Sequence, residues 1–323
     1  MSGPLRLGLV GCGRLAELGY VPAAALAADV ELVAVADPDP QRRAAVAELA
    51  GATAHPDAAS LLGVGEVDAV VLATPAAHHL ADAERAVEAG VPVLVEKPPG
   101  PDALGALALM RLGPSVRVGF NRRFDPAVAA VRAALPATGP LDLHLSIAYR
   151  RASWSAHTVR DEVLLDLVPH LVDWARWLTG ADVSSVAASE LVPDRAVLSL
   201  GLGRGRATVV AAADRLHEER VEVRDAAGAL VARHRTGGPV GAVLGRARAV
   251  ADRAAGRSTP HPLAASLAAQ LQAFAAAVRG DDPGELATAD DGLAAMAVVD
   301  AARTSATAGG APVPVIDLRE PTC

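Results

Sequence analysis

The chain has 323 residues, a formal net charge of −7 at pH 7 and 51% hydrophobic residues, of which few are aromatic. Its acidic balance and scattered arginines exclude a nucleic-acid surface, which needs a concentrated basic face. Its apolar runs are shorter than the roughly 18–20 residues needed to cross a bilayer, and the N-terminus lacks a signal-peptide layout. We therefore expect a soluble, cytoplasmic protein that binds neither nucleic acid nor membrane.

Residues 5–119 alternate between short apolar runs and Ala-rich helical patterns. The runs are continuously apolar, as strands buried on both faces of a parallel sheet require. They cover Leu5–Val10, Val30–Ala36, Ala69–Ala73, Pro92–Val95 and Val116–Gly119, and the helical patterns lie near 14–28, 40–50, 76–89 and 102–112. This alternation predicts a doubly wound parallel sheet of the Rossmann type over residues 1–122.

The pattern changes after residue 122, where we predict an α+β domain over 123–323. A helix (125–135), a strand (Leu141–Tyr149) and a helix near 166–179 precede several alternating stretches. Short turns such as Asp225–Gly228 between those stretches predict a large, open, mainly antiparallel meander. Helices near 263–279 and 290–308 and a strand at Val313–Ile316 follow, with the helices free to pack back on the first domain. The open face predicts a homodimer or homotetramer.

A G-x-G-x-x-A motif stands where the first predicted strand turns into a helix. Its first glycine permits the tight turn, and its second lets backbone approach a pyrophosphate beside the free N–H groups of the helix. The alternative is a tight turn without a ligand. We assign cofactor binding to the motif residues Gly11, Gly13, Arg14 and Leu15.

Asp37 ends the second predicted strand, where an acidic side chain binds a ribose 2′-hydroxyl. Its carboxylate would repel a 2′-phosphate, so NAD is the preferred cofactor. Arg14, Arg42 and Arg43 are close enough in sequence to keep NADP open. Asp37 can also cap the following helix, and the two roles are compatible.

Two further segments follow strands of the same predicted sheet, whose carboxyl ends face the ligand crevice. The first contributes Thr74, Pro75 and His79, and the second contributes Glu96 and Lys97. His78 and His79 are either first-turn residues near the nicotinamide or surface histidines. Lys97 is the only lysine beside 29 arginines. Because a lysine can share a proton and an arginine cannot, Lys97 is a catalytic candidate as well as a cofactor contact.

These motifs resemble the Gfo/Idh/MocA oxidoreductase family, which includes glucose–fructose oxidoreductase and inositol dehydrogenases. The resemblance rests on the glycine motif, Ala36-Asp37-Pro38, Ala73–His79, Glu96-Lys97-Pro98, Gly119–Phe124 and Asp300–Ala306. It implies a nucleotide domain, a second domain with an open sheet, and hydride exchange with sugars or cyclitols. It also implies a catalytic group of Lys97 with Asp166 and His170.

The chemistry of these residues suits that assignment. Asp166 and His170 stand four residues apart, so they share one face of a helix. Histidine titrates near neutral pH and suits a general base that removes the hydroxyl proton as hydride leaves carbon. Lys97 would stabilise the developing alkoxide, and Asp166 would orient the substrate or His170. The alternative roles are a helix N-cap for Asp166 and a packed helical histidine for His170.

Further polar and aromatic residues are candidates for substrate contact. They are Asn121, the only asparagine, together with Arg123, Tyr149, Trp154 and His157. Trp154 offers a flat face on which a sugar ring can stack.

One position departs from the family pattern, because Val168 stands where the family usually has glycine two residues before the histidine. A valine narrows the space that glycine leaves, so the substrate pocket is expected to differ in shape. Two alternatives to a dehydrogenase or reductase stay open. One is a redox-neutral epimerase or eliminase that recycles bound NAD, and the other is a non-catalytic dinucleotide-binding protein. Cys12 and Cys323 and the nine histidines show no metal-ligand spacing, so no metal site is predicted.

Overall fold

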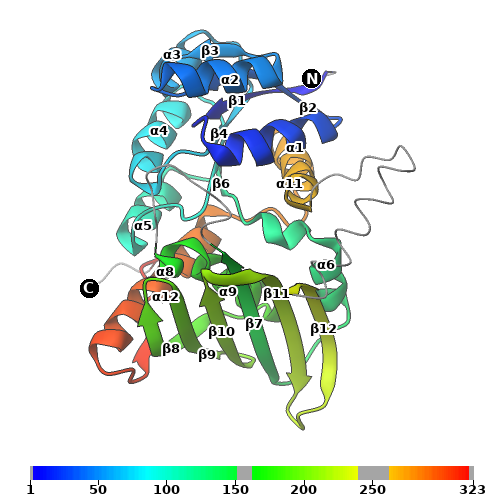
Figure 1. Cartoon of the computed structure of the whole chain (residues 1–323), viewed down its shortest axis with the longest axis vertical. Coiled ribbons are helices and arrows are strands. Elements are labelled where there is room, and N and C mark those ends of the chain that lie inside the picture. The colour runs from blue at the N-terminus through cyan, green and yellow to red at the C-terminus, as the bar shows by residue number, and fades with distance from the viewer. Residues whose placement is uncertain (1–2, 151–161, 239–261, 320–323) are drawn as a thin grey trace. The chain divides into compact units, whose positions relative to one another are not determined.

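The computed structural model of the chain describes residues 3–150, 162–238 and 262–319 (Figure 1). The chain divides into two compact units, which we describe separately. The first comprises Met1–Phe124 and His261–Leu293, and the second comprises Asp125–Pro260 and Ala294–Cys323. The first unit is therefore built from two separate stretches of sequence.

The first unit contains a parallel sheet of six strands in the order β3-β2-β1-β4-β5-β6. This order and direction confirm the predicted Rossmann sheet. Five of the strands match the predicted apolar runs, whereas β3 and the helix α3 (Ala58–Gly63) were not predicted. The strands are β1 (Leu5–Val10), β2 (Val30–Ala36), β3 (Thr53–His55), β4 (Ala69–Leu72), β5 (Val93–Val95) and β6 (Val116–Val118).

Helices follow the strands where the sequence predicts them. Asp39 and Asp102 cap α2 and α5 by accepting hydrogen bonds from backbone N–H groups of the first turn. The predicted helix at 14–28 is present as a continuous helical segment over residues 14–26, which contains a π-helical turn, η1 (Ala16–Tyr20), and ends with α1 (Val21–Leu26). The other helical segments of this unit are α2 (Pro40–Ala50), α4 (Ala76–Glu88), α5 (Ala103–Arg111), η2 (Asn121–Phe124) and α11 (Pro262–Arg279).

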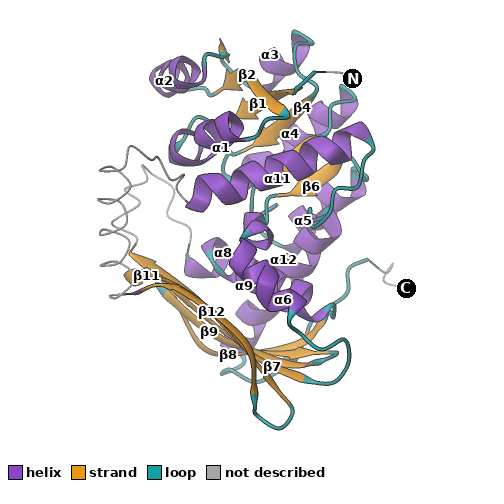
Figure 2. Ribbon diagram, turned by 90° about the vertical axis from the view of Figure 1, so that its right-hand side faces the viewer, coloured by secondary structure: helices purple, strands orange, loops and turns teal. Residues whose placement is uncertain are grey.

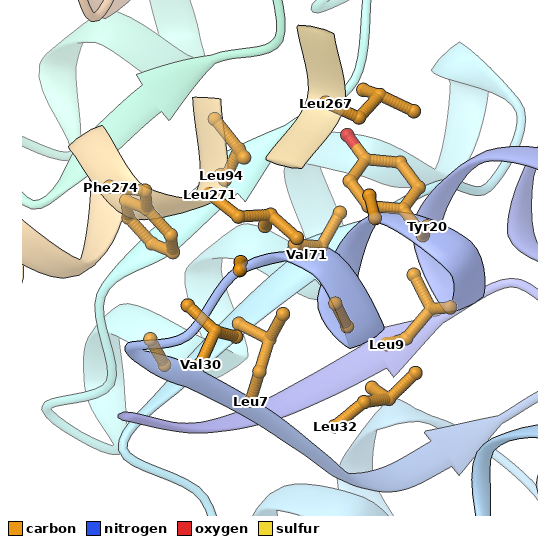
Figure 3. Packing of buried hydrophobic residues seen from close by; sticks show 14 of the residues in the cluster. Leu7, Leu9, Tyr20, Val30, Leu32, Val71, Leu94, Leu267, Leu271 and Phe274 are labelled. Carbon is orange, nitrogen blue, oxygen red and sulfur yellow. The ribbon is translucent and has the colours of Figure 1, made fainter. Parts of the chain in front are cut away.

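Apolar side chains cover both faces of this sheet. Leu9 and Val71 belong to one cluster, and their chain neighbours Val10 and Val70 belong to another on the opposite face. Figure 3 shows the first cluster, in which Leu267, Leu271 and Phe274 of α11 join strand residues and the Tyr20 ring. The continuous apolar runs in the sequence reflect this two-sided burial.

The second unit contains a mixed sheet of seven strands in the order β12-β11-β7-β10-β9-β8-β13. Most pairs are antiparallel, as predicted, but β7 lies between β10 and β11 and pairs parallel with β10. The short turns predicted an antiparallel meander of consecutive strands, but β7, which comes earlier in the chain, lies between the consecutive strands β10 and β11. The strands are β7 (Leu141–Arg150), β8 (Val183–Val192), β9 (Arg195–Leu202), β10 (Gly205–Ala212), β11 (Asp214–Asp225), β12 (Leu230–Gly237) and β13 (Val313–Pro314).

One face of this sheet carries helices, including α6 (Pro126–Ala133) and α9 (Val168–Thr179) (Figure 2). Along β7 the residues Leu143, Leu145 and Ile147 are buried, whereas the alternate residues Asp142 and His144 are only partly buried. The second face is therefore more polar. The short helix α8 (Val163–Asp166) precedes α9, and α12 (Ala289–Thr307) begins in the first unit and ends in the second.

Candidate active site

The glycine motif forms the turn between β1 and η1. Gly11 has a φ of +101°, and a Cβ there would lie 2.6 Å from the carbonyl oxygen of Ala73. A side chain at this position would therefore be strained and would clash with backbone. A Cβ on Gly13 would meet no atom within 4 Å. The loop is thus close-packed at its first glycine and open at its second, which fits the approach of a pyrophosphate.

Asp37 joins the ends of β1 and β2. Its Oδ2 accepts from the Cys12 backbone N–H at 2.8 Å, and its Oδ1 accepts from Asp39 N–H at 2.8 Å. Each carboxylate oxygen has a second lone pair, so the group can also accept from ribose hydroxyls. Arg42 Nη2 lies 3.6 Å from Oδ1, and Arg43 donates to the Asp37 carbonyl oxygen at 2.8 Å. The Asp37 carboxylate therefore suits the ribose hydroxyls of NAD, and the Arg42 guanidinium places a positive charge beside it.

Cys12 is buried inside the same loop. Burial, with Asp37 as the next cause, raises the pKa of its thiol to about 12. The thiol is therefore protonated at neutral pH and acts as a small packed side chain.

The His79 side chain contacts both the segment after β4 and the segment after β5. Its Nε2 lies 2.7 Å from the Thr74 carbonyl oxygen, and its Nδ1 lies 3.3 Å from the Pro99 carbonyl oxygen. It is 1% exposed, and this burial lowers its pKa, whereas His78 is exposed. Thr74 Oγ1 is buried and has no hydrogen-bond partner among the described residues, so it can still bind a ligand atom.

The turn after β5 carries Glu96 and Lys97, and the Lys97–Pro98 peptide bond is cis. The Tyr20 hydroxyl donates to Glu96 Oε1 at 2.6 Å, and the Lys97 backbone N–H donates to Glu96 Oε2 at 3.0 Å. Burial raises the pKa of Glu96, and burial together with Glu96 raises the pKa of Tyr20. Glu96 is thus a buried acceptor beside Lys97, while Lys97 itself is partly exposed.

The remaining predicted residues of the first unit make contacts within it. Asn121 Nδ2 donates to Ser266 Oγ at 2.9 Å. Arg123 is 7% exposed and forms an ion pair with Asp291 at 3.2 Å. Both side chains therefore have structural partners in addition to the substrate role expected of them. Arg14 and Leu15 are partly buried at the start of the helix that follows the glycine turn, and Pro75 is exposed at the start of α4.

In the second unit, Asp166 and His170 lie one turn apart. Asp166 ends α8 and His170 lies in the first turn of α9, while Leu167 between the helices keeps a right-handed helical backbone. Val168 begins α9, and its backbone is right-handed helical, a conformation that a valine adopts without strain although the family usually has glycine there. Pro169 lies in the first turn, where its missing N–H costs nothing.

The structure brings Tyr149 together with Asp166. Tyr149 is near the end of β7, and its hydroxyl donates to Asp166 Oδ2 at 2.5 Å. This bond orients one catalytic candidate through a residue expected to contact substrate. His170 is 5% exposed. Lys97 belongs to the first unit, whereas Asp166 and His170 belong to the second. Trp154 and His157 lie outside the described residues.

The sequence did not single out Tyr20 or Gln270. Tyr20 is 1% exposed, and Gln270 of α11 is fully buried with no hydrogen-bond partner for its amide in the described part of the chain. Gln270 offsets only a part of the rise in the pKa of the Tyr20 hydroxyl that burial and Glu96 cause. A tyrosine in the apolar first part of a predicted helix could have indicated this contact, because a buried tyrosine hydroxyl needs a hydrogen-bond partner. No such signal existed for Gln270.

Residues 3–150, 162–238 and 262–319 lack both a metal-binding cluster and a membrane-spanning helix. These residues contain no group of three or more His, Cys, Asp or Glu side chains able to hold a metal ion. Among the same residues, no helix combines the length and apolar character required to traverse a lipid bilayer.

Two family models match most of the chain. Residues 5–113 match the Gfo/Idh/MocA model described as an oxidoreductase family with an NAD-binding Rossmann fold. Residues 142–315 match the model of the C-terminal alpha/beta domain of the same family. The two matches correspond to the two sheets described above.

Individual relatives include two named inositol 2-dehydrogenases. Inositol 2-dehydrogenase 4 of Saccharopolyspora erythraea is 36% identical over 192 residues, which is 57% of this chain and 56% of that protein. The enzyme of Rhizobium meliloti is 29% identical over 329 residues, covering 92% of this chain and 96% of that protein. The chain thus aligns with little more than half the length of the first relative.

Solved structures share the fold. The myo-inositol dehydrogenase from Lactobacillus casei, determined in complex with NAD(H) and myo-inositol, superposes with a TM-score of 0.75. The two chains are 19% identical, and the alignment covers 99% of each. At this identity the likeness concerns the fold.

Proposed function

Because the chain belongs to the Gfo/Idh/MocA oxidoreductase family, we propose that it is an NAD-dependent dehydrogenase or reductase. Its reaction exchanges hydride with a secondary alcohol or ketone of a polyhydroxylated small molecule. The observation that carries this proposal is the glycine loop at the β1 end, with Asp37 beside it at the β2 end. This arrangement binds a dinucleotide in Rossmann domains.

The cofactor contacts follow from the first unit. The open backbone at Gly13 would face the pyrophosphate, and Asp37 would accept from the ribose hydroxyls. Thr74 Oγ1 supplies a buried hydroxyl at the same strand edge. A carboxylate in the ribose position disfavours a 2′-phosphate, so NAD is the preferred cofactor. NADP is the second candidate because Arg42 lies 3.6 Å from Asp37.

The catalytic roles are assigned residue by residue. A bound nicotinamide would accept or supply the hydride at the substrate carbon. His170 would take the proton from the substrate hydroxyl as general base. The Lys97 ammonium would stabilise negative charge on the substrate oxygen. Asp166, which accepts from Tyr149, would orient the substrate or His170.

Inositols are the first substrates to test. The supporting observation is that the similar proteins from Saccharopolyspora erythraea and Rhizobium meliloti are named inositol 2-dehydrogenases. Val168 is fully buried at the start of α9, two residues before His170. A branched side chain there would restrict the space near the proposed base, so a cyclitol or sugar other than myo-inositol belongs in the same screen.

The test combines binding and turnover. Purified protein, first checked by absorbance for a dinucleotide already bound, is titrated calorimetrically with NADH and NADPH. A panel of inositols and sugars is then assayed at 340 nm in both directions. Turnover with NADH and one polyol supports the proposal. A tightly bound dinucleotide with substrate conversion and no bulk NADH change indicates a redox-neutral enzyme instead. Failure to bind either dinucleotide indicates a non-catalytic protein.

We also propose that the polar face of the second unit's sheet forms a homo-oligomeric interface. Along β7 this face presents Asp142, His144 and Ser146, which are partly buried in a single chain, and Arg206 of β10 pairs with Asp142. Among the described residues, the helices of this unit pack on the other face of the seven-stranded sheet, which leaves this face available to a second copy of the chain. Light scattering after size exclusion tests the proposal, since a monomer at micromolar concentration would contradict it.

A further inference from the structure

Three buried polar side chains meet behind the turn that carries Lys97. They come from distant parts of the chain: Tyr20 from η1, Glu96 from the end of β5 and Gln270 from α11. All three are at most 6% exposed. Unpaired polar groups in such surroundings are costly, so the hydrogen bond between the Tyr20 hydroxyl and Glu96 constrains the positions of these two side chains.

The Glu96 carboxylate satisfies two donors at once. Oε1 accepts from the Tyr20 hydroxyl at 2.6 Å and Oε2 accepts from the Lys97 backbone N–H at 3.0 Å. A Cβ on Gly119 would lie 3.2 Å from this carboxylate, so the absence of a side chain there leaves it room. The carboxylate thereby connects the helix that follows the glycine loop to the residue that carries the ammonium.

The π-helical turn has a direct consequence for this contact. A π turn adds one residue to a helical turn and so rotates the side chains that follow it. Tyr20 is the last residue of that turn. Gly19 beside it packs closely, because a Cβ there would lie 2.8 Å from Leu267 of α11. The local helix geometry and the α11 contact together fix the position of the Tyr20 ring.

We propose that Tyr20 and Glu96 are positioning residues that hold the Lys97 backbone and thereby place its ammonium on the substrate oxygen. This inference rests on the proposed function, because it takes Lys97 as the group that acts on substrate. Neither residue is a catalytic residue in this scheme. Tyr20 holds Glu96, and Glu96 holds the Lys97 N–H.

The single lysine supplies a probe that does not depend on activity. Protein grown with ¹⁵N-lysine gives one lysine backbone amide resonance, that of Lys97, because the chain has no other lysine. Its chemical shift and hydrogen-exchange rate report the Lys97 N–H to Glu96 bond directly. Three variants are compared with the wild type: Tyr20→Phe, Glu96→Gln and the control Ser305→Ala. The control removes a buried hydroxyl of the second unit that bonds Ala188 N–H and the Ala311 carbonyl.

Tyr20→Phe keeps the ring but leaves Glu96 Oε1 without its donor. We expect the Lys97 amide to exchange about tenfold faster and kcat to fall about tenfold, the loss expected for a hydrogen bond to a charged group. The dissociation constant of NADH should stay within about threefold, because the glycine-loop contacts are unchanged. Ser305→Ala should leave both the Lys97 resonance and kcat per folded molecule unchanged.

Glu96→Gln removes the negative charge of residue 96 but keeps hydrogen-bonding groups at the same positions. Its carboxamide oxygen can still accept from the Lys97 N–H, and its NH₂ can donate to the Tyr20 oxygen. We therefore expect an amide protected nearly as in the wild type and a kcat within about threefold. A large loss of kcat with the Lys97 amide still protected would overturn the proposal in favour of a charge effect. An unchanged Lys97 amide in Tyr20→Phe would also overturn it.

The amide measurement keeps this proposal distinct from the proposed function. If no substrate is turned over by the wild type, the proposed function fails, yet the Lys97 resonance still tests the positioning contact. If the wild type is active and Tyr20→Phe is equally active with an altered Lys97 amide, only the positioning role fails.

Discussion

The backbone N–H of Cys12 donates to Oδ2 of Asp37 at 2.8 Å, so the glycine loop and the end of β2 are held together by the carboxylate expected to bind ribose. The Asp39 N–H donates to the other oxygen. The two carboxylate oxygens of Asp37 therefore hold the loop in shape, and their remaining lone pairs can accept hydrogen bonds from a ligand. Its replacement should affect both functions.

Replacing Asp37 with alanine should weaken NADH binding by about 10–100-fold, because hydrogen bonds to a charged acceptor are lost. NADPH binding should weaken less or improve, since the repulsion toward a 2′-phosphate is removed while Arg42 remains. Calorimetric titration with both cofactors measures the change. Asp57→Ala is the matched control, because Asp57 is an aspartate of the same unit whose carboxylate caps α3 by accepting from the Ser60 N–H. Unchanged NADH affinity in Asp37→Ala would refute the ribose role.

Replacing Lys97 with alanine should lower kcat by a factor of about 10²–10⁴ while NADH affinity changes little. Lys97→Arg keeps a cation and should also be severely impaired, because guanidinium differs from ammonium in shape and holds its protons permanently. Steady-state kinetics and NADH titration of both variants are compared. A fully active Lys97→Ala would exclude the catalytic assignment.

Replacing His170 with asparagine should lower kcat by about 10²–10⁴, the usual contribution of a positioned general base. The rate that remains should lose the dependence on pH near neutrality that an imidazole base confers. The measurement is the pH profile of kcat for wild type and variant. Identical profiles would assign His170 a packing role in α9.

Replacing Tyr149 with phenylalanine should cost roughly 1–2 kcal/mol of unfolding free energy and lower kcat, because the hydrogen bond from the Tyr149 hydroxyl to Asp166 Oδ2 is lost. Urea unfolding and kinetics are measured together. Thr179→Val is the control, since it removes a buried hydroxyl of α9 that donates to the Ala175 carbonyl oxygen. A comparable loss of stability without loss of kcat is expected there, and the same pattern in Tyr149→Phe would make its role structural.

Acidification should destabilise the protein through His79. Burial lowers the pKa of folded His79 below the ordinary 6.5. Between that lowered pKa and 6.5 the unfolded chain binds more protons than the folded chain, so stability falls as the pH drops through this window. The contribution is at most about 1.4 kcal/mol per pH unit. Urea unfolding from pH 7.5 to 5 should show a shallower slope for His79→Asn, while exposed His78→Asn should match the wild type.

Much of the first unit was predictable because its signals are local. Strands covered on both faces require uninterrupted apolar residues, so β1, β2 and β4 appear directly in the sequence. The need for glycine at position 11 was equally predictable from the motif, since its φ of +101° and the nearby Ala73 carbonyl leave no room for a side chain. The edge strand β3 was missed because it is three residues long and mostly exposed.

By itself, the sequence determined the parallel sheet, the glycine loop, the position of Asp37 and the identity of Lys97, Asp166 and His170 as candidates. The sheet, the loop and the position of Asp37 depend on residues close together in the chain, whereas the three catalytic candidates come from the resemblance of their motifs to the family. The tertiary structure decided which distant residues meet: β7 between β10 and β11, Tyr149 with Asp166, and Tyr20 with Glu96. The last two residues are 76 positions apart. Such pairings depend on packing and burial across the whole unit, which no local pattern of hydrophobicity records.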